Sequence, residues 1–312
     1  MKPDIAIVAD LPAVTGAALD AEFTVHRVSR ADTTAAALSP IADRIRAIVT
    51  SGFRGMTAAL MDALPKTEII ASFGVGYDSI DIAAAQARGI RVTNTPDVLT
   101  DDVADLALSL LLDAARGITA ADRYVRAGRW PTGPYPLGRS VTGKTLGILG
   151  LGRIGKAIAA RAQACGMKIA YHNRHPRSDV DYPYYPDAVA LATVTDFLVL
   201  AAPGGAATRH VVDAAVLRAL GRDGMLINIA RGSLVDETAL IAALQNGDIA
   251  GAALDVYARE PEVPAALIAM DHVVLLPHVG SATVETRQAM GQLVVDNLRA
   301  HFSGAPLLTP VV

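Results

Sequence analysis

The chain has 312 residues, of which 52% are hydrophobic, and its formal net charge is -3. This much apolar sequence can fill large buried cores and favours two domains over one. Charged residues make up 19% of the chain without a basic surplus, which argues against the electrostatic footprint of a nucleic-acid-binding protein. No apolar run is long enough to span a membrane.

The cysteine content and the first residues of the chain bear on the cellular compartment in which the protein is found. Cys165 is the only cysteine, so no internal disulfide is possible, which agrees with a reducing cytoplasm. The opening "MKPDIAIVAD" leads directly into a strand pattern and has no signal-peptide features. We therefore expect a cytoplasmic protein, and we expect no metal site.

The first ninety residues or so alternate short apolar strand patterns with helical ones. The expected strands are residues 4–9, 23–28, 45–50, 67–72 and 90–94. The expected helices are residues 13–21, 56–64 and 81–89. Alternation of this kind predicts a parallel sheet that is covered on both faces.

A long helix is expected over residues 99–116, because Thr100, Asp101 and Asp102 provide N-cap and first-turn chemistry. It is followed by residues 128–144, which contain three prolines and four glycines and are expected to form a surface excursion.

A second alternating series then begins. Its expected strands are residues 145–150, 168–173, 196–202, 224–230, 250–256 and 273–277. Its expected helices are residues 153–166, 213–221 and 236–247. A last helix, residues 284–302, is expected to pack on the first domain, because the sheet of the second domain is by then complete.

The segment "GLGRIG", which begins at Gly150, matches G-x-G-x-x-G between a strand pattern and a helix pattern, as a dinucleotide-binding turn requires. Gly150 permits the tight turn, Gly152 lets the backbone approach a pyrophosphate, and Gly155 lets the helix lie close to the strand. Arg153 and Ile154 present further N–H groups at the helix N-terminus, which favours phosphate. A dinucleotide cofactor is therefore expected.

The stretch "HNRHPR" bears on the choice of cofactor. Asn173 stands where many dinucleotide-binding proteins have an acid that binds the ribose of NAD and repels a 2′-phosphate. Arg174 and Arg177 follow, and guanidinium groups pair with a dianionic phosphate. The stretch favours NADPH over NADH, with a solvated basic loop as the alternative.

Polar residues follow three strands of the second series, at the edge where open α/β sheets bind ligands. Arg231 follows one strand, and His278 follows another. Asp255 lies at a third strand end, with Glu260 five residues later. Each residue alone has a structural interpretation, but one cation, one carboxylate and one imidazole beside a dinucleotide turn favour catalysis.

With these residues the sequence resembles the D-isomer-specific 2-hydroxyacid dehydrogenase family. The resemblance covers essentially the whole chain, through "FGVGYDSID", "RVTNTPDVLTDDVAD", "GLGRIG", "INIARGSLVDE", "ALDVYAREPEVP" and "LLPHVGSAT". Within the family the chain is similar to NADPH-dependent glyoxylate/hydroxypyruvate reductases and to hydroxyphenylpyruvate reductases.

The predicted fold class is α/β, with two doubly wound, parallel-sheet, Rossmann-like domains and an active-site cleft between them. Residues 1–97 and 285–312 are expected to form a discontinuous, flavodoxin-like substrate-binding domain. Residues 98–284 are expected to form the dinucleotide-binding Rossmann domain.

The resemblance also implies the roles of individual residues. Arg231 binds the carboxylate and polarises the carbonyl of a 2-oxoacid, His278 protonates the carbonyl oxygen, and Glu260 holds His278. The N–H groups of Val75 and Gly76 bind the substrate carboxylate. On the cofactor side, Asp255 faces the nicotinamide carboxamide, and the remaining contacts come from Pro203, Thr208, Ala230 and Gly280.

For the substrate pocket and the assembly, the resemblance gives weaker expectations. Candidate pocket walls, each with a core alternative, are Phe53, Arg54, Met56, Phe73 and Tyr77. The helix over residues 99–116 resembles the dimer-forming element of the family, so a homodimer is expected. The segment around Trp130 is expected to reach toward the partner subunit.

The predicted function is NADPH-dependent reduction of a small 2-oxoacid (glyoxylate, hydroxypyruvate or an aryl pyruvate) to the D-2-hydroxyacid, with NAD as a weaker cofactor. One alternative is an NAD-linked D-2-hydroxyacid dehydrogenase of another substrate class. The other is a non-catalytic dinucleotide-sensing corepressor on the same fold. The "HNRHPR" stretch disfavours the first alternative, and the set of Arg231, Glu260 and His278 disfavours the second.

Overall fold

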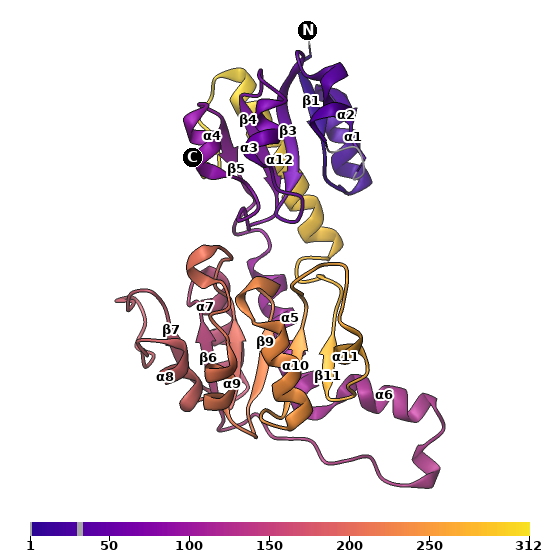
Figure 1. Cartoon of the computed structure of the whole chain (residues 1–312), viewed down its shortest axis with the longest axis vertical. Helices are drawn as coiled ribbons and strands as arrows, with labels where there is room; N and C mark the ends of the chain where they lie inside the picture. The colour runs from indigo at the N-terminus through magenta and orange to yellow at the C-terminus, as the bar shows by residue number, and fades with distance from the viewer. Residues whose placement is uncertain (1, 30–33) are drawn as a thin grey trace. The chain divides into compact units, whose positions relative to one another are not determined.

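A computed structural model describes residues 2–29 and 34–312, and the chain divides into two compact units. Unit 1 is Met1–Leu99 with Ser281–Val312, and unit 2 is Thr100–Gly280 (Figure 1). These limits lie close to the boundaries expected after residues 97 and 284. All pairings between the named strands are parallel. The prediction of two parallel-sheet α/β domains is confirmed.

Unit 1 has a five-stranded sheet of order β2-β1-β3-β4-β5, the order of flavodoxin-like folds. Its strands are β1 (Asp4–Ile7), β2 (Thr24–Arg27), β3 (Ile45–Ser51), β4 (Ile69–Phe73) and β5 (Arg91–Thr93). Its helices are α1 (Ala13–Glu22), α2 (Ala35–Leu38), the 3-10 helix η1 (Ser39–Ile41), α3 (Ala58–Asp62), α4 (Ile82–Ala87) and α12 (Val284–Ser303).

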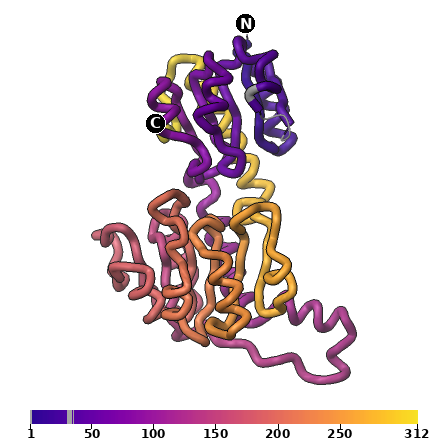
Figure 2. The backbone as a smooth tube through the Cα atoms, in the orientation of Figure 1, coloured from indigo at the N-terminus to yellow at the C-terminus, as the bar shows by residue number. Residues whose placement is uncertain are grey.

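Helices cover both faces of this sheet, so its interior strand β4 is buried at every position. On one face, α12 contacts β4 and α1. On the other, Leu38, Met61 and Ala85 bring α2, α3 and α4 into one hydrophobic core. After α12 the chain turns back and ends beside β5, where Thr93 and Pro310 form an isolated antiparallel bridge (Figure 2).

Unit 2 has a six-stranded sheet of order β11-β10-β9-β8-β6-β7, so the strand order reverses between β6 and β8. Its strands are β6 (Thr145–Leu149), β7 (Lys168–His172), β8 (Phe197–Leu200), β9 (Met225–Asn228), β10 (Gly251–Leu254) and β11 (Val273–Leu275). Its main helices are α5 (Thr100–Arg116), α7 (Arg153–Ala164), α8 (Ala188–Thr193), α9 (Ala214–Leu220), α10 (Glu237–Asn246) and α11 (Ala265–Ile268).

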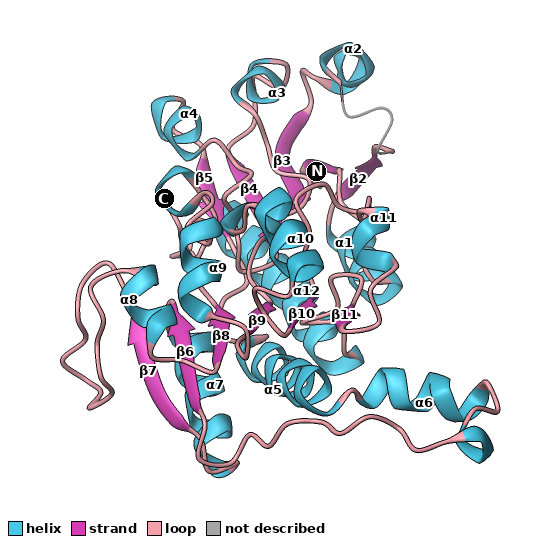
Figure 3. Cartoon of the chain, turned by 60° about the horizontal axis from the view of Figure 1, so that its bottom comes forward, coloured by secondary structure: helices cyan, strands magenta, loops and turns pink. Residues whose placement is uncertain are grey.

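The helices of unit 2 also lie in two layers (Figure 3). Helices α5 and α7 pack together and contact the sheet, while α9 packs against both α8 and α10. Strands β8, β9 and β10 are buried along their whole length as a result. The carboxyl ends of all six strands therefore meet at one edge of a sheet whose faces are covered.

The surface excursion expected over residues 128–144 contains the 3-10 helix η2 (Trp130–Thr132). Helix α6 (Ile118–Arg126) precedes it in the same segment of unit 2 and was not expected, and neither helix has a buried residue. The segment extends away from the sheet of its unit (Figure 2), and residues 118–138 are called the arm below. None of the described helices is both long and apolar enough to cross a lipid bilayer.

Candidate active site

The site residues predicted in unit 2 follow the carboxyl ends of its strands. In chain order, those after β6 to β11 are Gly150, Asn173, Pro203, Arg231, Asp255 and His278. Because the strands are parallel, these residues share one edge of the sheet, and in open α/β sheets ligands bind at that edge where the strand order reverses.

The glycine turn lies at the point of reversal. Gly150 has φ 102°, a backbone conformation that favours glycine, and a Cβ atom there would lie 2.5 Å from the Ala202 nitrogen. A Cβ at Gly155 would lie 2.3 Å from the Gly150 oxygen, so α7 approaches the strand closely only because Gly155 has no side chain. A Cβ at Gly152 would meet nothing within 4 Å. Gly152 thus leaves open space in front of the α7 N-terminus, which starts at Arg153 and Ile154 and has N–H groups without helical partners.

Asn173 connects the end of β7 to this turn. Its side-chain oxygen accepts a hydrogen bond of 2.6 Å from the Leu151 N–H. The amide oxygen is therefore occupied by the protein, and the NH₂ group is left as the donor that a ligand can use.

The two arginines of the basic loop differ in their partners. Arg177 makes a bidentate ion pair with Asp179, at 2.7 and 2.9 Å, and Lys156 pairs with the same carboxylate. The hydrogen bonds from Arg177 and Lys156 hold the pKa of Asp179 well below its usual range. Arg174 has no hydrogen bond or ion pair with another described residue. Of the two expected phosphate-binding arginines, the structure leaves Arg174 available and gives Arg177 an internal partner.

Pro203 and Thr208 belong to one closed turn after β8. The Thr208 hydroxyl donates to the Pro203 carbonyl at 2.8 Å, and its N–H donates to Gly205 at 3.2 Å. The structure therefore brings these two predicted residues together at the sheet edge.

Close contacts join the loops after β9, β10 and β11. A Cβ at Gly232 would lie 1.9 Å from the Tyr257 carbonyl carbon, so the residue after Arg231 presses against the β10 loop. The Tyr257 hydroxyl lies 2.8 Å from the Leu276 oxygen, which ties that loop to β11. Burial raises the pKa of Tyr257 to about 12, so the hydroxyl stays a neutral donor.

The imidazole of His278 is held by a carboxylate. Its Nδ1 lies 2.6 Å from Glu260 Oε2, while the other oxygen of Glu260 accepts from the Tyr257 N–H at 3.0 Å. Burial opposes ionisation of Glu260, but the hydrogen bond and charge of His278, the Tyr257 N–H and the charge of Arg231 together lower its pKa. An ionised Glu260 accepts a hydrogen bond from Nδ1–H, so Nε2 is the nitrogen left to face a ligand.

Asp255 holds the turn that carries His278. Its two oxygens accept from the Val279 N–H at 2.7 Å and the Gly280 N–H at 2.8 Å, and the His278 N–H donates to its backbone oxygen at 2.9 Å. Burial raises the pKa of this carboxyl, which is 1% exposed, while the two N–H donors oppose the shift. His278 has φ 54°, an unusual conformation for a residue with a side chain, so the turn needs such support.

Arg231 is positioned by Asn228, the last residue of β9. The buried Asn228 side chain donates to the Arg231 carbonyl at 2.9 Å and accepts from the Ala230 N–H at 3.0 Å. The guanidinium group itself donates to the Ala230 carbonyl at 2.7 Å. Its charge acts on Glu260, so the structure brings Arg231, Glu260 and His278 into one electrostatic group.

The remaining predicted residues, Val75 and Gly76, lie in unit 1 after β4. The loop that contains them is tied to the loop after β3, since the Ser79 hydroxyl donates to the Gly52 carbonyl at 2.6 Å. Among the expected pocket walls, Met56 and Phe73 are buried in the core of unit 1, at 1% and 4% exposure. The core alternative holds for these two.

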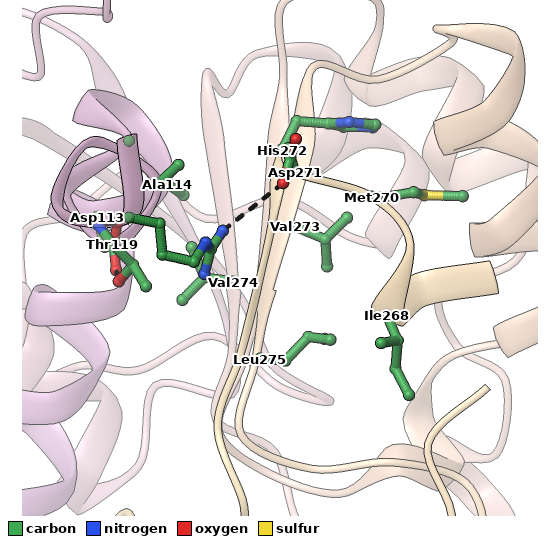
Figure 4. Close-up of a pocket in the computed structure, with 13 residues that line it drawn as sticks. Asp113, Ala114, Thr119, Ile268, Met270, Asp271, His272, Val273, Val274 and Leu275 are labelled. Atoms are coloured by element: carbon green, nitrogen blue, oxygen red, sulfur yellow. Dashed lines mark hydrogen bonds and ion pairs between the residues drawn. The ribbon is translucent and has the colours of Figure 1, made fainter. Parts of the chain in front are cut away.

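A separate pocket of about 320 Å³ lies near the opposite end of β11 (Figure 4). Asp271 and His272, which line it, precede β11, whereas His278 follows that strand. The Arg123 guanidinium lies 3.9 Å from the Asp271 carboxylate in this pocket. Its other walls combine apolar residues, such as Ile268 and Met270, with polar ones, such as Asp113 and Thr119. Its place near the start of β11 separates this pocket from the polar site described above, which follows the strand ends.

The arrangement in unit 2 can bind a dinucleotide at the glycine turn and an anion at Arg231, and it can supply a proton from His278. A comparison with protein families agrees: residues 108–280 match the model of the D-isomer specific 2-hydroxyacid dehydrogenase NAD binding domain. The chain belongs to the D-isomer-specific 2-hydroxyacid dehydrogenase family.

Similar proteins span almost the whole chain. Hydroxyphenylpyruvate reductase of Plectranthus scutellarioides is 53% identical over 271 residues, which cover 87% of each chain. The 2-ketogluconate reductase of Gluconobacter oxydans is 47% identical and covers 100% of this chain and 99% of its own. A crystal structure of an NADPH-dependent glyoxylate/hydroxypyruvate reductase from Sinorhizobium meliloti, in complex with NADP and malonate, has a TM-score of 0.96 at 48% identity and covers 100% of this chain and 97% of its own.

Sequence reasoning missed three residues that shape the dehydrogenase site: Asn228, Tyr257 and Asp179. The sequence did contain a signal for Asn228, which is a polar residue at the end of an otherwise apolar strand. Such a residue is costly to bury unless it is hydrogen-bonded, so it is expected to bind neighbouring groups. Tyr257 and Asp179 gave no such signal, because their partners depend on how the loops fold.

The contrast between Gly155 and Gly152 predicts two different outcomes. Gly155→Ala should lower the free energy of unfolding by about 1–3 kcal/mol, because its Cβ clashes with the Gly150 carbonyl. Gly152→Ala should leave urea unfolding nearly unchanged and weaken dinucleotide binding about tenfold or more, because its Cβ occupies the open space. Urea titrations and nucleotide fluorescence titrations measure the two effects. Wild-type nucleotide affinity in Gly152→Ala would contradict this assignment.

Proposed function

We propose that the protein is an NADPH-dependent D-2-hydroxyacid dehydrogenase that reduces small 2-oxoacids to D-2-hydroxyacids. The observation that carries the proposal is the Glu260–His278 pair, held together with Arg231 at the sheet edge that also carries the glycine turn. The names of the relatives support a 2-oxoacid substrate, and the NADP in the Sinorhizobium meliloti complex supports the cofactor. Glyoxylate, hydroxypyruvate and aryl pyruvates are the substrates to compare.

The chain has donors that fit NADPH. The open space at Gly152 admits a pyrophosphate, and the α7 N-terminus favours its charge. The NH₂ group of Asn173 and the guanidinium of Arg174 suit a ribose 2′-phosphate. Pro203, Thr208, Ala230 and Gly280 are proposed to line the rest of the cofactor site, with Asp255 near the nicotinamide. The reduced nicotinamide, when bound, supplies the hydride.

The protein residues have separate roles in the reduction. Arg231 binds the carboxylate of the 2-oxoacid and draws electron density toward the carbonyl oxygen. As hydride reaches the carbonyl carbon, Nε2 of His278 gives its proton to that oxygen. Glu260 accepts the hydrogen bond from Nδ1–H and so orients the ring with Nε2 toward the substrate.

In unit 1, Val75 and Gly76 are proposed to bind the substrate carboxylate through their N–H groups. That the site lies between the two domains stays a prediction from the sequence, as does the cytoplasmic location.

The main test is loss of nicotinamide absorbance with glyoxylate, hydroxypyruvate or phenylpyruvate, run with NADPH and with NADH. We expect turnover with NADPH that exceeds turnover with NADH. Arg174→Ala should cost about 1–3 kcal/mol in kcat/KM for NADPH and leave NADH nearly untouched, because only NADPH carries the 2′-phosphate. Arg177→Ala should cost less, since Asp179 already pairs with Arg177.

Equal losses with both cofactors in Arg174→Ala would contradict the phosphate role. No turnover of any 2-oxoacid by the wild-type protein would contradict the proposed function itself. His278→Asn, which retains the cofactor residues of the turn, should bind NADPH normally and lose turnover.

The lowered pKa of Glu260 predicts a dependence of turnover on pH. Glu260 is ionised at neutral pH and holds Nδ1 of His278. As pH falls through the lowered pKa of Glu260, the carboxyl is protonated and that hold weakens, so kcat/KM for 2-oxoacid reduction should fall on the acid side. In Glu260→Gln, which cannot ionise, this acid limb should disappear, and kcat/KM near neutral pH should be about tenfold lower. A pH profile measured at saturating NADPH tests this, and a wild-type acid limb in Glu260→Gln would refute the role of Glu260.

We also propose that the arm of unit 2 makes a homodimer contact. Helix α6 is strongly amphipathic, yet it has no buried residue. Large apolar side chains along the arm are exposed, with Leu137 at 100%, Trp130 at 68% and Val125 at 54%. Such a concentration of apolar surface supports a protein partner, and the homodimer expected from the sequence supplies one. Trp130 is then the residue proposed to reach toward the partner's pocket.

If the arm forms the dimer contact, a charge introduced among its apolar side chains should weaken dimerisation. Wild-type protein at micromolar concentration should sediment as a dimer. Val125→Asp should weaken association by at least about tenfold, because an unpaired charge in an interface costs several kcal/mol. Val189→Asp, at an exposed position of helix α8, is the matched control and should leave the dimer intact. A wild-type monomer would refute the proposal.

A further inference from the structure

The loop after β4 in unit 1 is fixed by the residues that follow β5. The Asn94 NH₂ group donates to the Val75 carbonyl at 2.8 Å. Thr95 binds Gly74 twice: its N–H donates to the Gly74 carbonyl at 2.9 Å, and its hydroxyl accepts from the Gly74 N–H at 3.0 Å. Asn94 and Thr95 are themselves buried, so these bonds are shielded from water.

Because the peptide group is planar, these hydrogen bonds also fix the directions in which the neighbouring N–H groups point. In a trans peptide, the carbonyl of one residue and the N–H of the next point in opposite directions. Because Thr95 holds the Gly74 carbonyl, the Val75 N–H points away from β5. Because Asn94 holds the Val75 carbonyl, the Gly76 N–H points away as well. Neither N–H has a hydrogen-bond acceptor among the described residues, so two adjacent donors face the same side.

The C-terminal tail, residues 308–312, holds Asn94 in turn. The Thr309 hydroxyl donates to the Asn94 carbonyl at 2.6 Å, and the Asn94 N–H donates to the Thr309 carbonyl at 3.4 Å. Farther along the tail, the Val311 N–H donates to Val92 at 2.7 Å. Val311 and Val312 also pack against the hydrophobic core of unit 1, which secures the end of the tail.

Asn297, on α12, connects the tail to the body of the unit. It is fully buried and uses all four of its hydrogen-bonding positions. Its NH₂ group donates to Leu293 at 2.8 Å and to the Thr309 hydroxyl at 2.9 Å, and its oxygen accepts from the N–H groups of Leu308 and Thr309, each at 3.1 Å. A continuous chain of hydrogen bonds therefore runs from Asn297 through Thr309 and Asn94 to Val75.

We propose that Asn94 is a positioning residue for substrate binding, and that the C-terminal tail is the clasp that holds it through Thr309 and Asn297. The inference rests on the proposed function, in which the Val75 and Gly76 N–H groups bind the substrate carboxylate. The clasp sets the direction of these two donors before substrate arrives, so less binding free energy is lost in ordering the loop.

The position of the clasp makes its effect specific. Neither Asn94 nor Thr309 belongs to the glycine turn, the basic loop or the Glu260–His278 pair. Loosening the clasp should therefore weaken binding of a carboxylate substrate and leave NADPH binding and the acid limb of the pH profile unchanged. A tail that only stabilised the fold would lower the melting temperature without this selectivity.

The test compares Asn94→Ala and Thr309→Val with wild-type protein, on the 2-oxoacid that the wild type reduces best. Asn94→Ala removes the bond to Val75 and should raise the KM for that 2-oxoacid about tenfold, with kcat reduced less and the KM for NADPH unchanged. Thr309→Val removes one hydroxyl, one step farther from the loop, and should raise the same KM about two- to threefold. Calorimetric titration of the NADP-bound protein with malonate should show the same order of weakening without any turnover.

Thr195→Val is the matched control. It also removes a buried hydroxyl, which is bonded to the Ala192 carbonyl at 3.2 Å in unit 2, far from the loop in the chain. Thr195→Val should lower the melting temperature about as much as Thr309→Val does, but it should leave the KM for the 2-oxoacid unchanged.

The outcomes are distinguishable. Unchanged oxoacid KM and malonate affinity in both Asn94→Ala and Thr309→Val, with wild-type turnover present, would overturn the clasp and leave the proposed function standing. An equal rise of KM in Thr195→Val would also overturn it, because the effect would then be one of general stability. If Asn94→Ala does not fold, the milder Thr309→Val decides the question alone.

Discussion

The hydrogen bond between Glu260 and Nδ1 of His278 is the interaction on which the chemistry of unit 2 depends. It joins the loops after β10 and β11, and it fixes which ring nitrogen is free to act on a ligand. The second oxygen of Glu260 is held by the Tyr257 N–H, so the carboxylate has little freedom to turn. A solvated and mobile carboxylate could not determine which of the two ring nitrogens carries the proton.

The neighbouring acid, Asp255, serves the same site by different physics. Its burial is unfavourable for a charge, and two backbone N–H groups offset that cost while the carboxylate holds the His278 turn in a left-handed conformation. One carboxylate therefore orients the imidazole, and the other supports the backbone that carries it. Under the proposed function, unit 2 holds the side chains that act on the substrate, and unit 1 contributes the N–H groups of Val75 and Gly76.

Regular periodicity made the strands and the glycine turn predictable. Apolar runs bounded by glycine or proline found all eleven strands among residues 2–29 and 34–312, and the motif spacing located Gly150, Gly152 and Gly155 correctly. The set of Arg231, Glu260 and His278 was also predicted, because parallel strands bring their carboxyl ends to one edge. Periodicity failed for α6, whose apolar side faces solvent instead of a core.

What the sequence did not reveal were interactions decided by loop conformation. The pairing of Arg177 with Asp179 joins residues two positions apart, and only a particular turn lets their side chains meet. Met56 and Phe73 follow or end strands, as pocket residues do, yet the chain turns them into the core. The contacts of Asn94 were hidden for a further reason, since its partner Thr309 lies more than two hundred positions away.

The hydrogen bond from the Leu151 N–H to the Asn173 side chain bears on how the coenzyme preference of this protein can change. That bond uses only the oxygen of the amide, and an aspartate has an oxygen in the same place. Exchange of Asn173 for aspartate would keep this bond and add a negative charge, which a 2′-phosphate would meet unfavourably and a free ribose hydroxyl would not. One position can therefore bear on coenzyme preference while the loops after β9, β10 and β11 keep their contacts.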